Sequence, residues 1–361
     1  PLLIKRFDIK KRVIIDALDV DERSLEILKK IMSKIEIPSN VSINFICDDF
    51  ITHQFQEHYD YVIGNPPYGK MSSRDKRLKA YRQGAINKMT TNICSFFLDK
   101  CVELGDEIAL VLPKAVLNIP EFATTRAYLS RCRVSSILDF GEIGFKGVLV
   151  ETIALIVSTV SKPLYTTVYS MTHNLCETKK QSYICDDSLP YWVIYRNELF
   201  DSVAAKMQFD VFSVFRDRQI TNGKLHKQGD LRILKSRNLD DRGKSIVSIP
   251  GYDAYMQTSE AANLAVYRFM NCNNIYITPN MTYKPRVMLK PTGTLVNGSV
   301  AILIPKEGIK PTNEQLEYFS SDEYRKFYQI ARNYQTRSLN VDACSVYFFG
   351  LLKEGEFKCR G

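Results

Sequence analysis

The sequence lacks the features that mark several specialised classes of protein. Its 361 residues contain no run of about 18 apolar residues, which excludes a transmembrane helix. It has no low-complexity stretch, and 45% hydrophobic with 25% charged residues excludes a mainly disordered chain or a collagen-like fibre. A typical domain length of about 150 residues predicts two domains.

Metal-binding patterns are also missing. The nine cysteines and four histidines form no C-x-x-C pair and no cluster with the spacing of a metal site, so we expect no bound metal. The cysteines are odd in number and mostly lie in apolar contexts, such as Cys94 before Ser95-Phe96-Phe97. Buried free thiols indicate a reducing compartment, so we expect a cytoplasmic, nucleoid-associated protein without membrane contact.

Positive charge is distributed unevenly along the chain. Residues 201–361 contain 23 Lys and Arg against 16 Asp and Glu, whereas residues 1–200 contain 26 against 24. A basic half joined to a near-neutral half predicts a module that binds a polyanion, attached to a second domain. A solvated basic surface without a partner is the alternative on charge alone.

Hydrophobic patterning in the first 160 residues predicts alternating strands and helices. Strands are expected at 13–18, 43–47, 59–64, 107–112, 136–140 and 152–158, and helices at 22–35, 91–104 and within 115–131. Strands that are apolar nearly throughout and alternate with helices favour an α/β fold. We therefore expect a doubly wound, Rossmann-like domain with a mostly parallel sheet.

The pattern changes after Lys162. An aromatic stretch at 191–195 is strand-like, and short β-like runs follow at 231–234, 275–278, 287–289 and 299–304, with one charged helix at 313–332. We expect the Rossmann-like domain to span residues 1–195 and a β-rich α+β domain to span residues 196–361.

Polar residues cluster where the predicted strands end. The clusters are Asp19 with Asp21, Asp48 with Asp49, Asn65, and Lys114. In doubly wound sheets, ligands bind beyond the carboxyl ends of the strands. Each acid alone is better explained as a solvated loop residue or a helix cap, but four successive clusters favour a binding site.

The strongest chemical signal is the run from Asp60 to Tyr68, DYVIGNPPY. A strand ends at Asn65, and Pro66 and Pro67 fix two successive φ angles, so the loop is rigid. The Asn65 side-chain oxygen and the Pro66 carbonyl oxygen can then accept both hydrogens of one planar amino group, which raises the electron density on its nitrogen. Tyr68 adds a flat face on which a ring can stack.

Asn65-Pro66-Pro67-Tyr68 resembles the catalytic motif of the S-adenosylmethionine-dependent amino-methyltransferases. With its neighbours, it is similar to the adenine-specific (N6) DNA methyltransferases of the gamma arrangement. The resemblance implies S-adenosyl-L-methionine as cofactor and double-stranded DNA as partner. It also implies a target adenine that leaves the duplex, stacks on Tyr68 and offers its N6 hydrogens to Asn65 and Pro66, without a metal or a general base.

The resemblance extends to cofactor and base contacts. Asp19 matches the acid that accepts the ribose hydroxyls of the cofactor, with Asp21 as the weaker candidate. Asp49 and Phe50 look like the pair beside the cofactor adenine. Phe145 looks like the second aromatic residue, which covers the target base opposite Tyr68; a core phenylalanine is the alternative.

One family feature is missing from this sequence. The glycine-rich cofactor loop, Phe-x-Gly-x-Gly, lies before the ribose acid in the family, and no such run precedes Asp19. Glycines there allow the backbone to approach the methionine part of the cofactor. Because the predicted strand before Asp19 is otherwise intact and the chain starts with Pro1, without Met, we expect this loop to precede Pro1 in a longer protein.

The family resemblance covers about residues 1–160, and the later part resembles another region more loosely. Stretches 299–306, 318–325 and 331–339 are similar to target-recognition regions of type II restriction–modification adenine methyltransferases, in particular those paired with type IIS endonucleases. This implies a DNA target-recognition domain and a cognate restriction endonuclease as partner. The expected DNA contacts are Arg332, Asn333, Arg337, Lys284 and Arg286, with packed or surface-charge roles as the alternative.

Three other functions remain open from the sequence. Methylation of cytosine N4 uses a similar loop, although the motif order favours adenine. Protein-glutamine and ribosomal-RNA amino-methyltransferases share the motif, but a basic, β-rich C-terminal half is harder to explain for them. A non-catalytic DNA-binding subunit with the same fold is the alternative from another class.

Overall fold

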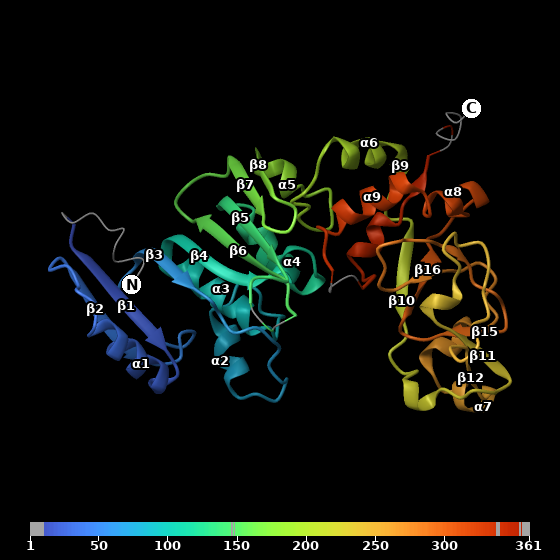
Figure 1. Cartoon of the computed structure of the whole chain (residues 1–361), viewed down its shortest axis with the longest axis horizontal. Helices are drawn as coiled ribbons and strands as arrows, with labels where there is room; N and C mark the ends of the chain where they lie inside the picture. The colour runs from blue at the N-terminus through green and yellow to red at the C-terminus, as the bar shows by residue number, and fades with distance from the viewer. Residues whose placement is uncertain (1–10, 146, 148, 337–339, 354, 356–361) are drawn as a thin grey trace. The chain divides into compact units, whose positions relative to one another are not determined.

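The structure is a computed structural model that describes residues 11–145, 147, 149–336, 340–353 and 355 (Figure 1). The chain divides into two compact units: unit 1 ends at Leu110 and unit 2 begins at Val111. The expected boundary at 195/196 lies inside unit 2, so the compact units differ from the two expected domains. The functional division into 1–195 and 196–361 stays a prediction.

Unit 1 combines parallel strand pairs with helices, as the hydrophobic pattern predicts. Each of its strands contains apolar β-branched residues, and the prolines after Asn65 end the third strand because they cannot donate to a ladder. Its elements are β1 (Val13–Asp19), α1 (Glu22–Met32), β2 (Val41–Cys47), β3 (Tyr59–Gly64), α2 (Arg77–Gln83), α3 (Ile93–Leu104) and β4 (Gly105–Pro113), which continues into unit 2.

The pairing of β1 with β2 brings two strand ends together. The strands are parallel, and their register runs from Val13 opposite Val41 to Asp19 opposite Cys47. Helix α1 packs on both strands and buries Leu25. Since both strands stop at the same level, Asp19 and the acids after Cys47 lie at the same edge.

The pairing of β3 with β4 presents the proline loop. These strands are also parallel, with Tyr59 opposite Gly105 and Gly64 opposite Leu110. Helix α3 buries Phe96 and Leu98. The loop that starts at Asn65 is therefore held by a packed strand.

The first part of unit 2 contains the strand order β6-β5-β7-β8. The elements there are α4 (Ala123–Leu129), β5 (Arg133–Gly141), β6 (Thr152–Ser158), β7 (Tyr165–Ser170), β8 (Leu175–Lys180) and α5 (Gln181–Ile184). Strands β5 and β7 are parallel, but β6 and β8 are antiparallel to their neighbours. The expectation of a mostly parallel sheet is wrong for these two, because their connections are too short for a crossover helix.

The later part of unit 2 is rich in short strands, as expected. Two sheets, β10-β16-β13-β14 and β12-β11-β15, share one apolar core. The elements are α6 (Glu198–Lys206), β9 (Met207–Gln208), β10 (Phe212–Arg216), β11 (Leu231–Leu234), β12 (Ala254–Met256), α7 (Thr258–Ala261), β13 (Tyr276–Pro279), β14 (Met288–Leu289), β15 (Thr294–Val296), β16 (Val300–Pro305), α8 (Asn313–Tyr318), α9 (Asp322–Ala331) and β17 (Leu351–Leu352).

Two expected elements differ from the structure. The stretch 191–195 is buried, which explains its apolar pattern, but it forms no strand. The helix expected at 313–332 is split into α8 and α9, because the Ser321 side chain accepts a hydrogen bond from the Tyr324 N–H and starts a new helix. Within the described residues, no helix has the length and apolar character needed to cross a membrane.

Candidate active site

A cavity of about 600 Å³ in unit 1 brings most of the predicted site residues together. Its walls come from the C-terminal half of β1, the segment after β2, the length of β3, and helices α2 and α3. Of the predicted residues, Asp19, Asp49, Phe50, Asn65, Pro66 and Pro67 line it. Tyr68 does not line the cavity, but it touches Asn65, which does.

The proline loop arranges Asn65 and Tyr68 as a bonded pair. The Tyr68 hydroxyl donates to Asn65 Oδ1 at 3.0 Å. Asn65 and Pro67 are exposed, while Pro66 is buried. Burial raises the pKa of Tyr68 to about 12, so its hydroxyl keeps its proton at neutral pH. The amide oxygen of Asn65 has a second lone pair with which to accept a further hydrogen.

The two acids that follow β1 have different surroundings. Asp19 lines the cavity, and its Oδ1 accepts a hydrogen bond from the Asp21 N–H at 2.9 Å. Asp21 is the N-cap of α1: it accepts from the Arg23 N–H at 3.2 Å and from the Ser24 hydroxyl at 2.7 Å. The hydrogen bond from Ser24 lowers the pKa of Asp21. This geometry favours Asp19 over Asp21 as a ligand contact.

Of the two acids that follow β2, Asp48 has a structural partner and Asp49 lines the cavity. Asp48 accepts from His53 Nδ1 at 2.7 Å, which lowers the pKa of Asp48. Asp49 accepts from the Ile51 N–H at 3.0 Å and from the Tyr81 hydroxyl. Burial, together with this bond to Asp49, raises the pKa of Tyr81 to about 12.

Aromatic rings form one wall of the cavity. Phe50 stacks on Phe97 with ring centroids 5.0 Å apart and meets Phe55 edge-on at 5.5 Å. All three residues line the cavity. An aromatic wall beside strand-end carboxylates suits a ligand that joins a flat heterocycle to hydroxyl groups.

Several cavity residues are not predicted by the sequence, among them Asp16 and Tyr59. The Tyr59 hydroxyl donates to Asp16 Oδ2 at 2.5 Å, and both residues line the cavity. Burial raises the pKa of Tyr59 above its usual range. Asp16 lies inside a strand and not at its end, so the strand-end rule gave no signal for it.

The residues present fit the adenine and ribose part of S-adenosylmethionine, and the glycine-rich loop expected beside its methionine part is not in this sequence. The cavity volume falls within the range of about 300–1,000 Å³ typical of small-molecule sites. Asp19 Oδ2 has no hydrogen-bond partner within the described part of the chain and can accept a ligand hydroxyl. Within the described residues, no group of three His, Cys, Asp or Glu side chains could hold a metal ion.

Phe145 and Lys114 belong to unit 2. Phe145 is half-buried, and its pairing with Tyr68 of unit 1 across a base stays a prediction. Lys114 is buried: its Nζ lies 2.6 Å from Asp139 Oδ2 and 3.7 Å from Glu151 Oε1. The structure therefore gives Lys114 an internal ion-pairing role.

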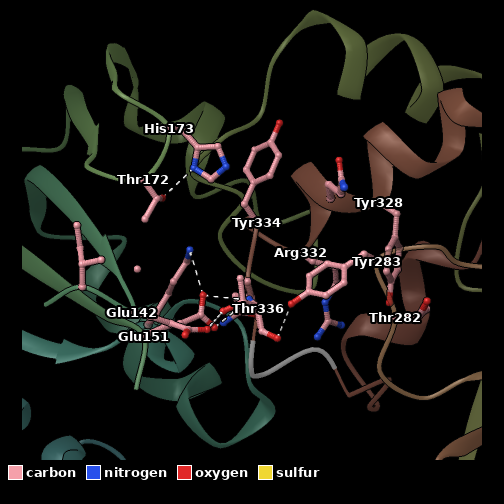
Figure 2. Close-up of a pocket in the computed structure, with 15 residues that line it drawn as sticks. Glu142, Glu151, Thr172, His173, Thr282, Tyr283, Tyr328, Arg332, Tyr334 and Thr336 are labelled. Carbon is pink, nitrogen blue, oxygen red and sulfur yellow. Dashed lines mark hydrogen bonds and ion pairs between the residues drawn. The ribbon is translucent and has the colours of Figure 1, made fainter. Parts of the chain in front are cut away.

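A second cavity, of about 430 Å³, lies within unit 2 (Figure 2). Glu151 accepts the Thr336 N–H through both carboxylate oxygens at 3.0 Å, and the Tyr283 hydroxyl donates to the Thr336 carbonyl at 2.8 Å. The rings of His173 and Tyr334 lie 4.4 Å apart (Figure 2). This cavity is therefore built around the chain segment that follows α9.

Most of the predicted DNA contacts are not at the surface. Arg332 is 1% exposed and donates to the Asn340 carbonyl at 3.2 Å. Asn333 is fully buried: its side chain donates to the Trp192 carbonyl and accepts from the Ile194 N–H.

Arg286 is 8% exposed and donates to the Ser236 and Leu239 carbonyls. The assignment of Arg332, Asn333 and Arg286 to DNA is thus corrected to internal roles, since groups bonded inside the fold cannot reach a base or a phosphate. Lys284 is exposed, and Arg337 lies outside the described residues.

Comparison with known proteins finds sequence similarity in the first part of the chain. The family described as Eco57I restriction-modification methylase matches residues 7–145. The type II methyltransferase M.VspI of Vibrio sp. (strain 343) is 28% identical over 142 residues, which are 38% of this chain and 34% of that protein. M.CvrRI of Paramecium bursaria Chlorella virus XZ-6E is 33% identical over 112 residues, 30% of this chain and 26% of that protein.

These matches span about a third or less of the length of the curated relatives. Among solved structures, the type IIL restriction-modification enzyme MmeI, solved in complex with DNA, has a TM-score of 0.51 and 12% identity. That match covers 91% of this chain and 54% of MmeI, and it concerns the fold alone. Residues 7–145 are therefore similar in sequence to methyltransferases of restriction–modification systems.

Proposed function

We propose that this chain carries the catalytic centre of a site-specific DNA methyltransferase, which methylates adenine N6 in restriction–modification. The observation that carries the proposal is the cavity in unit 1, whose wall holds Asp19, Asp49-Phe50 and Asn65-Pro66-Pro67 together. Strand-end acids, an aromatic wall and paired carbonyl acceptors are what a transfer between a nucleoside cofactor and an amino group requires.

In this proposal, Asp19 accepts the ribose hydroxyls of S-adenosylmethionine. Asp49 and Phe50 hold its adenine, beside Phe55 and Phe97. When bound, the cofactor supplies a methyl group on a positively charged sulfur. Asp49 already accepts two hydrogen bonds, which fix its carboxylate, and a carboxylate has room for a further donor.

Asn65 and Pro66 bind the target amino group. Their two oxygens accept its hydrogens, which raises the electron density on the nitrogen and aims its lone pair. The bond from the Tyr68 hydroxyl holds Asn65 Oδ1 in place, and the Tyr68 ring stacks on the extruded base. Phe145 covers the other face of the base.

Adenine is proposed as the base because the order of the elements matches the gamma arrangement. The cofactor acids precede the Asn65 loop, and the basic, β-rich part follows it. In this proposal, double-stranded DNA is the partner, and the later part of the chain is a target-recognition region. A cognate restriction endonuclease would cut the same site when it is unmethylated.

The test is to express the protein in a host free of DNA methylation and to sequence the host DNA by a single-molecule method. N6-methyladenine at one recurring sequence is the expected result. N4-methylcytosine instead would correct the base. Unmodified DNA from cells that contain folded protein would contradict the proposal, and isothermal titration with S-adenosylmethionine would then separate a protein or RNA methyltransferase from a non-catalytic subunit.

A further inference from the structure

Unit 1 carries a dense positive segment that no part of the catalytic chemistry uses. Between residues 70 and 88 the chain has seven Lys or Arg and one Asp, whereas the rest of residues 1–110 has ten basic and fifteen acidic residues. The near-neutral total of unit 1 therefore hides a strong local concentration of positive charge. We call residues 69–92 the α2 platform.

Backbone hydrogen bonds close the α2 platform at its base. The Met71 N–H donates to the Thr91 carbonyl at 2.8 Å, and the Ile93 N–H donates to the Gly69 carbonyl at 3.0 Å. Lys70 and Asn92 form an antiparallel bridge between these bonds. The two ends of the platform are thus joined to each other, and the platform begins directly after Tyr68.

A small apolar core makes the platform rigid. Leu78 and Tyr81 of α2 are buried with Met71, Ala85 and Phe96. The Tyr81 hydroxyl also donates to Asp49 at the cavity wall.

A second tie lies at the far end of α2. The buried Asp99 carboxylate accepts the Asn87 N–H at 3.0 Å. The charged helix is therefore a fixed structure, tied to the residues that form the candidate active site.

Six of the seven cations of the platform divide into two groups, and Lys70 lies in the bridge at its base. Arg77 pairs with Asp75 at 2.8 Å, and Arg82 donates to the Thr90 carbonyl, so both have structural partners. The other group consists of exposed side chains for which the described part of the chain supplies neither an acid nor a hydrogen-bond acceptor: Arg74, Lys76, Lys79 and Lys88.

Four unpaired cations on one rigid segment of 24 residues repel each other in the absence of a partner. Such a group is stabilised by a ligand with regularly spaced negative charges. A duplex carries one phosphate charge per about 1.7 Å of its axis and matches this pattern. A peptide or a lipid surface as partner would not explain why these cations lie directly beside Asn65.

We propose that the α2 platform binds the phosphate backbone of the DNA next to the base that Asn65 receives. This inference rests on the proposed function, and it adds a contact surface in unit 1 where the sequence placed DNA contacts only in the later half. The DNA strand is held by Lys79 on α2, by Lys76 at the N-cap of α2, and by Arg74 and Lys88 on either side of the helix in the sequence. The contact is sequence-independent and positions the duplex over the cavity.

The test measures DNA binding of the full chain by fluorescence anisotropy over a series of salt concentrations. Each lost phosphate contact lowers the slope of log K against log salt by about one. The double variant Lys76→Gln/Lys79→Gln is expected to bind DNA more weakly and to lower this slope by about two. Arg74→Gln/Lys88→Gln is an independent second pair with the same expected result.

The matched control is Lys30→Gln/Lys34→Gln, which removes two exposed lysines that precede the Asn65-Pro66-Pro67-Tyr68 motif in the sequence. It is expected to keep the wild-type affinity and slope. Wild-type affinity and slope in both platform variants, while the wild-type protein methylates DNA, would overturn the platform and leave the proposed function standing. A wild-type protein that neither binds nor methylates DNA would overturn both.

Discussion

At the scale of single residues, the structure separates side chains that look equivalent in the sequence. Asp19 and Asp21 are two residues apart, yet one lines the cavity and the other caps α1. Asn65 is held by Tyr68 and keeps an acceptor site for a ligand. The chemistry of the site therefore depends on which oxygen lone pairs already accept hydrogen bonds within the protein.

Asn65→Ala removes the amide oxygen that is proposed to accept an amino hydrogen. We expect turnover to fall by about a hundredfold or more, because one preorganised hydrogen bond at a reacting centre contributes about that much. DNA binding should be largely kept, since phosphate contacts lie elsewhere. Parallel measurements of turnover and DNA affinity check this, and equal losses in both would contradict the assignment.

Asp19→Ala should weaken cofactor binding, whereas Asp21→Ala should lower stability. Loss of Asp19 is expected to weaken S-adenosylmethionine binding by about tenfold or more, because a hydrogen bond to a charged group contributes about 1.5–3 kcal/mol. Loss of the Asp21 cap should lower the free energy of unfolding and leave cofactor affinity unchanged. Calorimetric titration and urea unfolding of both variants decide, and a reversed pattern would make Asp21 the ligand.

At the scale of elements, α3 and the α2 platform are linked by a buried acid. Burial raises the pKa of Asp99 to about 6 from an ordinary value near 3.8. The folded protein therefore binds this proton more tightly than the unfolded chain does. The stability gained from protonation is fully present below about pH 4 and is lost as the pH rises through about 6, a difference of about 3 kcal/mol at most.

Asp99→Asn removes this titration while keeping the shape of the side chain. We expect the variant to gain stability relative to wild type between pH 4.5 and pH 7. Urea unfolding at the two pH values measures it, with the same comparison for Asp60→Asn, an exposed acid, as control. Identical pH dependence in wild type and Asp99→Asn would show that Asp99 is not the titrating group.

Local sequence patterns predicted the elements that depend on local chemistry. The capped helix after Asp21, the strand before Asn65 and its end at two prolines follow from residues within a few positions of each other. Whether a side chain is buried depends on residues that are far away from it in the sequence. Arg332 and Asn333 have the composition of a DNA-reading segment, but they are packed in the interior by contacts with residues far away in the sequence, such as Trp192.

The same limit explains what the sequence left out. The apolar stretch 191–195 has the pattern of a strand because burial and strand formation produce the same pattern. The α2 platform was missed because charge was compared between halves of the chain, and the acids elsewhere in residues 1–200 cancelled it. Counting charge in windows of about 20 residues would have found it.

At the scale of the whole molecule, the account assigns the chemistry to unit 1. Its cavity gathers residues from the ends of three strands, as the carboxyl edge of an α/β sheet does. Unit 2 contains a separate cavity built around the segment after α9, and the proposed chemistry does not use it. The central claim is thus that cofactor and target amino group meet in the cavity of unit 1.

The most direct measurement is photochemical cross-linking of methyl-labelled S-adenosylmethionine to the protein, followed by mass spectrometry of its peptides. The account predicts label in peptides that line the unit 1 cavity, around Asp19, Phe50 or Asn65. Asp19→Ala should reduce the label, and Asp21→Ala should keep it. Label confined to peptides beyond residue 111, or no label with folded protein, would contradict the account.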